Sequence, residues 1–216
     1  MWCGTPPQRQ TLIINTGGHG TAFPCTGCQG NCGKGPHTDD YFQPERSSTF
    51  QEPACDQCAF GECPNYDPSS RGQRCQFSLG YAEGSSWTST EANDYCYIGG
   101  LHNKALSIDD TGADDLDPHI AERYAFHLHF CCQTSLSGLF QEQLADGILA
   151  MDNSNVSFWH QMYDKGKISE ELLSRCFSRQ RSVSREGTRA GAMTLGGSDD
   201  RLHLYPMVYS KHEDVW

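Results

Sequence analysis

The segment 12–18, Leu-Ile-Ile-Asn-Thr-Gly-Gly, constrains the fold more than any other part of this chain. Its three apolar residues, two of them β-branched, predict a buried strand. The Thr-Gly-Gly that follows permits a sharp turn in which the backbone can reach positive φ. The side chain of Asn15 is therefore expected at the mouth of a strand, where a functional group would be presented.

Around this strand the sequence resembles the amino-terminal lobe of the pepsin-like aspartic proteases. That family has a Gly-Thr-Pro-Pro-Gln entry, an apolar strand and then Asp-Thr-Gly-Ser, whose aspartate is one of two catalytic carboxylates. Residues 4–8 match the entry, and Thr16 and Gly17 match the turn, but Asn15 replaces the aspartate and Gly18 replaces the serine. The resemblance implies an all-β fold, a single pepsin-like lobe with short helices, in which residues 16–18 form the active-site loop.

The exchange at position 15 decides what chemistry is expected. The family needs two carboxylates that share one proton, so that one acts as a base toward water and the other as an acid toward the peptide carbonyl. An amide does not titrate in this range and cannot take a proton from water. Asn15 therefore predicts an endopeptidase homologue that is inactive or severely impaired.

The overall composition limits the partners. The chain has 216 residues, which suits one domain or one large lobe, and a formal net charge of −11 that argues against nucleic acid or anionic membranes. No apolar stretch of about 18 residues is present, so no membrane span is expected. The first residues have neither a basic nor an apolar leader region, and we expect no signal peptide.

Twelve cysteines are too many for an ordinary cytosolic protein of this size. The C-x2-C pairs at 25/28 and 55/58 could bind zinc, because such pairs present two thiolates to one metal. We favour disulfides that staple a Gly- and Pro-rich loop in the secretory pathway or outside the cell, with the connectivity left open. Residues 23–75 resemble the cysteine-rich insertion of the nepenthesin-like and plasmepsin-type branches of the family, and we call them the insertion.

A second motif follows the insertion. Alternating apolar residues over 76–81 predict a strand ending at Tyr81, and Glu83, Gly84 and Ser85 form a hairpin tip. This hairpin resembles the family's flap, which folds over bound peptide, with Tyr81 at the position of the flap tyrosine. The alternative is that Tyr81 is only a half-buried strand aromatic, and its spacing from Asn15 favours the flap.

Other chemistry-bearing motifs receive no catalytic role. The Asp-Thr-Gly within 109–118 lies among further acids and lacks an apolar strand, so it is interpreted as a solvated loop. The alternation from Tyr124 to Phe130 predicts a strand with His127 and His129 on its surface side; a metal on these imidazoles lacks an obvious third ligand. We expect neither a metal nor a cofactor.

The carboxyl-terminal half contains the remaining elements of the resemblance. Residues 145–151 resemble the strand that frames the family's catalytic loop, so Asp146 is interpreted as structural. Short helices are predicted over 157–163 and from 169–173. Residues 192–199 resemble the Leu-x-Leu-Gly-Gly-x-Asp that ends the lobe. Cys131 could pair with Cys3 or stay a free thiol.

The resemblance therefore gives a lobe over residues 1–209, with 210–216 as the start of a carboxyl-terminal lobe that is absent. A bare apolar face would follow and would favour self-association. Three functions compete: an aspartic endopeptidase homologue acting on peptide or protein, a peptide-binding or decoy protein that does not cleave, and a cysteine-rich zinc module.

Overall fold

The structure, a computed structural model, describes residues 1–29, 32, 37–67, 72–99, 120–177, 191–199, 205 and 208. The chain divides into two compact units, Met1–Lys167 and Ile168–Trp216, which are described separately. Strands predominate in both, and the helices are short, as the predicted all-β lobe requires. Among the described residues, no helix is long and apolar enough to cross a membrane.

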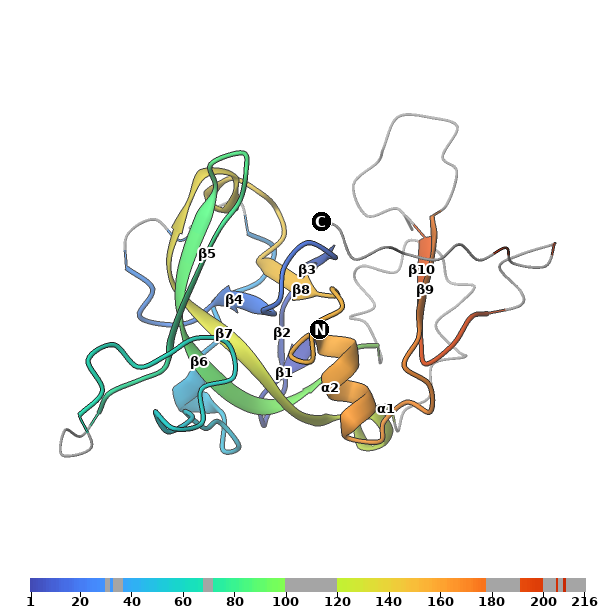
Figure 1. Ribbon diagram of the computed structural model, residues 1–216, viewed down its shortest axis with the longest axis horizontal. Coiled ribbons are helices and arrows are strands. Elements are labelled where there is room, and N and C mark those ends of the chain that lie inside the picture. Colours follow the sequence, from blue (N-terminus) through green and yellow to red (C-terminus); the bar gives the residue numbers. More distant parts are fainter. Residues whose placement is uncertain are drawn as a thin grey trace. The chain divides into compact units, whose positions relative to one another are not determined.

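The first unit is built on one mixed sheet, shown in Figure 1, with strand order β2-β1-β6-β7-β4-β8-β3 and with β5 paired to β6. The strands are β1 (Trp2–Cys3), β2 (Gln8–Arg9), β3 (Leu12–Asn15), β4 (Ala22–Pro24), β5 (Gln76–Gly80), β6 (Ser86–Tyr97), β7 (Phe126–Ser137) and β8 (Gly147–Ala150). Its helices are η1 (Pro44–Arg46), α1 (Ile120–Tyr124), η3 (Gly138–Gln141) and α2 (Phe158–Asp164). In the second unit, β9 (Leu173–Phe177) and β10 (Gly191–Leu195) form an antiparallel pair.

The long antiparallel pair of β6 and β7 carries the core. Phe130 of β7 stacks on Phe23 of β4 with ring centroids 4.7 Å apart, and Phe42 from the insertion meets Phe130 edge-on. These three rings are fully buried. Burial of aromatic rings removes large apolar areas from water, and the free energy gained helps to offset the conformational entropy lost on folding.

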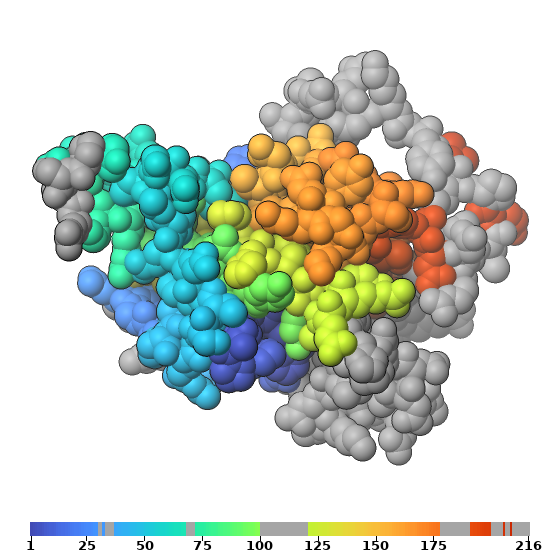
Figure 2. Space-filling view, turned by 90° about the horizontal axis from the view of Figure 1, so that it is seen from below, coloured from blue at the N-terminus to red at the C-terminus, as the bar shows by residue number. Residues whose placement is uncertain are grey.

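Disulfides form as the cysteine count predicted. Two of them are buried in the sheet, Cys3–Cys96 and Cys25–Cys132, and three lie within the insertion, Cys28–Cys32, Cys55–Cys63 and Cys58–Cys75. Cys131 remains a buried free thiol, because Cys3 pairs with Cys96 across the β1–β6 ladder. In Figure 2 the described part of the insertion, coloured light blue to cyan, forms a continuous part of the surface.

Several predictions about secondary structure and burial were wrong. The strand at 12–15 forms, but Ile13 and Ile14 are 45% and 38% exposed, because among the described residues β3 lies at an edge of the sheet and has β8 as its one neighbour. Tyr124 ends α1 and does not lie in a strand. Residues 169–171 form bends and Leu173 already begins β9, since pairing with β10 outweighs a weak helix-start signal.

The remaining predictions concern one helix, two histidines and an acidic segment. The helix predicted over 157–163 is α2, although Ser157 at its N-cap makes no side-chain capping bond. His127 and His129 are half-buried, not on the surface. The acidic segment 109–118, interpreted above as a solvated loop, lies outside the described residues.

Asp146 joins the starts of β3 and β8. Its carboxylate is 2% exposed and accepts hydrogen bonds from the backbone N–H groups of Thr11 and Asp39. Burial raises the pKa of Asp146 to about 6, and the neighbouring Asp39 carboxyl adds to the rise. Burial alone would raise the pKa of Asp39 as well, but hydrogen bonds from Thr11 and Arg9 outweigh it and keep that pKa low.

We therefore predict a specific pH dependence for Asp146→Asn. A carboxyl whose pKa is raised in the folded state contributes stability that is fully present below its unfolded value of 3.8 and is lost as the pH rises through about 6. The unfolding free energy of the wild type should thus increase relative to that of Asp146→Asn as the pH falls from about 7 to about 4. Denaturant unfolding at each pH measures this, and the exposed Asp56→Asn is the control. A difference that stays constant over this range would contradict the prediction.

Candidate functional site

The position of Asn15 is set by the parallel pairing of β3 with β8. Asn15 lies opposite Ala150, and the Met151 N–H donates to the Asn15 carbonyl at 2.8 Å. Parallel neighbours end at the same edge of a sheet, so the turn after Asn15 and the chain after Met151 leave side by side. Asn15 therefore lies at the end of a strand, as the sequence predicted.

The side-chain amide of Asn15 is used at both ends. Its Oδ1 accepts from the Gly17 N–H at 2.8 Å, which closes an Asx turn, and its Nδ2 donates to Tyr81 Oη at 3.1 Å. Gly18 leaves room for this second bond, because a Cβ there would lie 3.1 Å from Nδ2 and 3.2 Å from Oη. A side chain at position 18 would therefore crowd the Asn15–Tyr81 bond by a few tenths of an ångström, and the φ of Gly18 is not in the positive range.

Tyr81 reaches Asn15 from the tip of the β5–β6 hairpin, which projects from the sheet in Figure 1. The Tyr81 N–H donates to the Ser85 carbonyl at 2.8 Å, and Gly84 supplies the turn with φ of +95°. Ser85 is buried, and its Oγ accepts from the Leu139 N–H of η3 at 3.0 Å. Glu83 is exposed at the tip. The hairpin is therefore tied to the first unit on both sides of Gly84.

The Tyr81 ring packs on Phe140 with centroids 5.4 Å apart, beside a buried cluster that includes Trp87 and Leu136. Burial raises the pKa of Tyr81, while the Trp87 indole and the Asn15 amide oppose the shift. The phenol is therefore neutral at physiological pH. Because its oxygen accepts from Asn15, its proton is available to a ligand.

No carboxylate meets Asn15 in the described part of the chain: the hydrogen-bond partners of its side chain there are Gly17 and Tyr81. An ionisable pair does lie on the same two segments. His19 Nδ1 and Asp152 Oδ2 are 2.6 Å apart, with His19 well exposed and Asp152 held by the Ser154 hydroxyl at 2.8 Å. Sequence reasoning missed this pair, and only the closeness of His19 to Asn15 along the chain could have suggested it.

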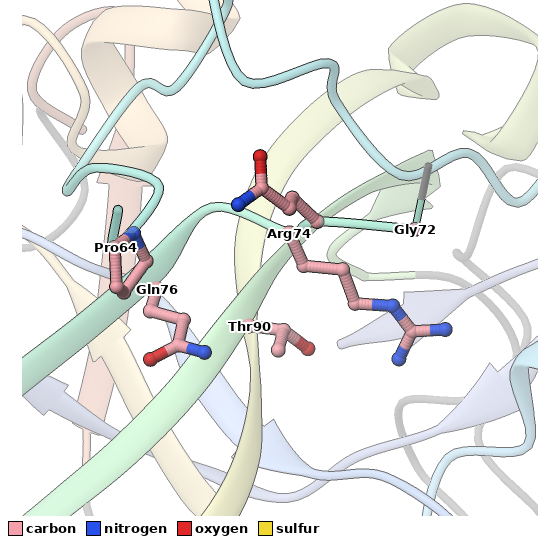
Figure 3. A pocket seen from close by; sticks show the side chains of 6 residues that line it. Pro64, Gly72, Arg74, Gln76 and Thr90 are labelled. Atoms are coloured by element: carbon pink, nitrogen blue, oxygen red, sulfur yellow. The ribbon is translucent and has the colours of Figure 1, made fainter. Parts of the chain in front are cut away.

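Two surface hollows lie elsewhere. One of 180 Å³, shown in Figure 3, is lined by Pro64, Gly72, Gln73, Arg74, Gln76 and Thr90 at the base of the β5–β6 hairpin. The other, of 340 Å³, is lined by residues that include Trp2, Arg9 and Arg46. Neither contains Asn15 or Tyr81.

His127 and His129 have neighbours other than metal ligands. The His129 Nε2 lies 3.4 Å from the Asn93 side-chain amide nitrogen, and His127 packs edge-on against Tyr95. Among the described residues, three side chains with metal-binding atoms lie close enough together to share an ion. All three are cysteines, and neither histidine belongs to the group.

We predict that Asn15 and Tyr81 are energetically coupled. Asn15→Ala and Tyr81→Phe should each destabilise the chain, and their double-mutant cycle should give a coupling of about 0.5–1.5 kcal/mol, as expected for one hydrogen bond. Denaturant unfolding measures the cycle. As a control, the destabilisation caused by Tyr163→Phe at an exposed position should simply add to that caused by Asn15→Ala. If the effects of Tyr81→Phe and Asn15→Ala also add, the hydrogen bond between them contributes nothing to stability.

Sequence comparison relates the chain to known proteins. A family model described as "Xylanase inhibitor N-terminal" matches residues 1–197. Aspartic protease 5 of Toxoplasma gondii is 28% identical over 220 aligned positions, covering 94% of this chain and 20% of that protein. Plasmepsin V of Plasmodium falciparum (isolate 3D7) is 27% identical over 146 residues, covering 68% of this chain and 21% of that protein. The chain thus spans about a fifth of the length of these relatives.

Proposed function

Because the chain belongs to the xylanase inhibitor N-terminal family, the amino-terminal lobe of the pepsin-like aspartic protease fold, we propose that it is an aspartic endopeptidase homologue that does not hydrolyse peptide bonds. The observation that carries the proposal is the neutral Asn15 amide at the end of β3, held by Gly17 and Tyr81.

The chemistry explains why this exchange matters. Hydrolysis by this family requires a carboxylate that removes a proton from water and a second carboxyl that protonates the peptide carbonyl. Asn15 can donate and accept hydrogen bonds but cannot gain or lose a proton in this pH range. A water molecule at Asn15 would be bound and oriented, yet it would stay unactivated.

A second candidate function is peptide binding without cleavage. The hairpin supports it, because Tyr81 keeps a free hydroxyl proton and Glu83 is exposed at the tip. The Asn15–Tyr81 bond holds the hairpin against position 15, so an extended peptide has to break this bond in order to bind. Part of the binding energy would be spent on that opening.

The surroundings and partners proposed for the chain follow from its covalent structure and charge. Five disulfides among the described residues support the secretory pathway or the extracellular space, since such bonds persist in oxidising compartments. The net charge of −11 supports a peptide or protein partner over nucleic acid.

The chain should not cleave an unstructured protein substrate at acid pH, and pepstatin should have no effect on it. Asn15→Asp alone should also give no robust cleavage, because no second carboxylate lies against position 15 in the described residues. Fluorogenic peptide assays measure turnover. Exposed Asn155→Asp makes the same change of charge away from the site and is the matched control.

Turnover by the wild type that disappears in Asn15→Ala would overturn the proposal. Robust cleavage by Asn15→Asp, but not by Asn155→Asp, would show instead that this chain assembles a complete pair of carboxylates.

Self-association through β3 is a further expected property. This edge strand exposes Ile13 and Ile14, and unpaired strand edges pair with other chains. Ile13→Lys should shift sedimentation toward the monomer at high protein concentration. Leu139→Lys alters a residue of η3 that is more exposed than Ile13, at 59% against 45%, and should leave the sedimentation unchanged. Equal effects of both variants would argue against the strand edge.

A further inference from the structure

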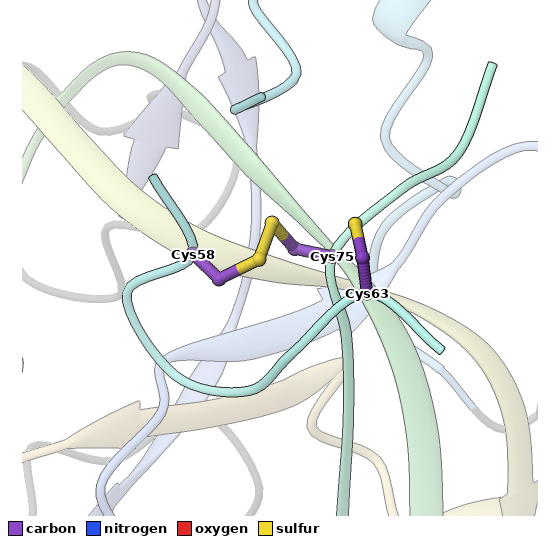
Figure 4. A group of neighbouring side chains, drawn as sticks. All are labelled: Cys58, Cys63 and Cys75. Atoms are coloured by element: carbon purple, nitrogen blue, oxygen red, sulfur yellow. A yellow bond between two sulfur atoms is a disulfide. The ribbon is translucent and has the colours of Figure 1, made fainter. Parts of the chain in front are cut away.

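The insertion gathers four cysteine sulfurs in one place. The Sγ atoms of Cys58, Cys63 and Cys75 all lie within 4.8 Å of one another, as Figure 4 shows, and Cys55 is bonded to Cys63. We call Cys55, Cys58, Cys63 and Cys75 the cysteine cluster. It consists of two adjacent disulfides, Cys55–Cys63 and Cys58–Cys75.

The spacing of the cluster is close to what a metal would require. Four thiolates around tetrahedral Zn²⁺ have Zn–S distances of about 2.3 Å and therefore S···S separations of about 3.8 Å. The three sulfurs already lie within 4.8 Å of one another, and opening the Cys58–Cys75 bond of 1.99 Å requires its two sulfurs to move apart by about 1.8 Å to reach this separation. Cys55 and Cys58 also have the C-x2-C spacing that presents two thiolates to one metal.

Contacts that involve no sulfur hold the loop between these cysteines. The Glu91 carboxylate of β6 is 1% exposed and accepts from the N–H groups of three consecutive residues, Ala59 at 2.6 Å, Phe60 at 3.1 Å and Gly61 at 2.7 Å. Charge-assisted bonds of this kind are among the stronger hydrogen bonds in proteins. The loop therefore remains attached to β6 when the disulfides are open.

A backbone bridge aligns the other two cysteines. The Glu62 N–H donates to the Gln76 carbonyl at 3.2 Å, and the Gln76 N–H donates to the Glu62 carbonyl at 2.8 Å. Cys63 and Cys75 flank this bridge. A Cβ at Gly61 would lie against the Gln76 carbonyl oxygen, so the close approach requires glycine there. The four thiols thus stay close together after reduction.

Each disulfide of the cluster has one half-buried cysteine, as Cys28–Cys32 also has, so a reductant reaches the three insertion disulfides before those of the sheet. Cys55 and Cys58, one partner of each disulfide, are half-buried, whereas Cys3 and Cys96 are fully buried and Cys25 and Cys132 nearly so. Reduction requires a reductant to contact a sulfur atom. Mild treatment should therefore open the cluster while the disulfides of the sheet remain.

We propose that the reduced cysteine cluster is a tetrathiolate Zn²⁺ site. A dithiol reductant opens each disulfide, supplying two electrons and two protons and becoming a disulfide itself. The four thiols then release their protons as Zn²⁺ binds to the sulfurs. The insertion thus has an oxidised form closed by disulfides and a reduced form closed by metal. The site does not depend on the proposed function at Asn15.

The full chain tests this directly. Treatment with a water-soluble phosphine, which is oxidised to its oxide and binds zinc weakly, opens the accessible disulfides. Equilibration with Zn²⁺ and desalting should then leave one zinc per chain, against none for the untreated chain. Cd²⁺ in place of Zn²⁺ should produce the ultraviolet thiolate-to-metal charge-transfer band. Alkylation and mass mapping should show zinc protecting the cluster cysteines.

Two double variants provide the controls. Cys58→Ser with Cys75→Ser should abolish zinc retention, whereas Cys28→Ser with Cys32→Ser, which removes the third insertion disulfide, should retain one zinc. Circular dichroism and the intact Cys3–Cys96 bond verify folding in each case. The proposal is overturned if the reduced wild type retains no zinc, or if zinc protects cysteines outside the cluster instead.

Discussion

The parallel pairing of β3 with β8 is held at both ends, and the location of the candidate site depends on it. At the start, the Asp146 carboxylate accepts from the Thr11 N–H, and at the end the Met151 N–H donates to the Asn15 carbonyl. These bonds use backbone groups of Thr11, just before β3, and of Asn15 at its end, and they do not depend on the side chain at position 15. An aspartate and an asparagine there would occupy the same place, so the exchange changes the chemistry and leaves the framework intact.

The amide also changes which way a proton is directed. Asn15 donates through Nδ2 to Tyr81 Oη, so the phenol oxygen is the acceptor and its proton faces away from this bond. A carboxylate at the same position has no proton to donate and would instead accept from the Tyr81 hydroxyl. Gly18 belongs to the same arrangement, because it leaves space where the two groups meet. The departures from the family pattern at positions 15 and 18 are thus structurally related.

Sequence reasoning was accurate where a local pattern decides the structure. The apolar run before Asn15 and the alternation up to Tyr81 both form the expected strands, and the cysteine count predicted disulfides. It was inaccurate where distant segments decide. Exposure of Ile13 follows from its place at the sheet edge, and the His19–Asp152 contact joins residues 133 positions apart. The disulfide partners were equally beyond reach, because any connectivity is compatible with the same spacing.

The insertion and the hairpin are connected through β5 and β6. Glu91 of β6 holds the loop of the cysteine cluster, and β5, which begins directly after Cys75, pairs with β6 and leads to Tyr81. Any change in how the cluster is closed therefore acts on the strand that carries the tyrosine over Asn15. Hydrogen bonds to Glu91 limit that change, because they hold the loop whichever bonds the sulfurs make. The loop can consequently exchange its covalent links without losing its place on the sheet.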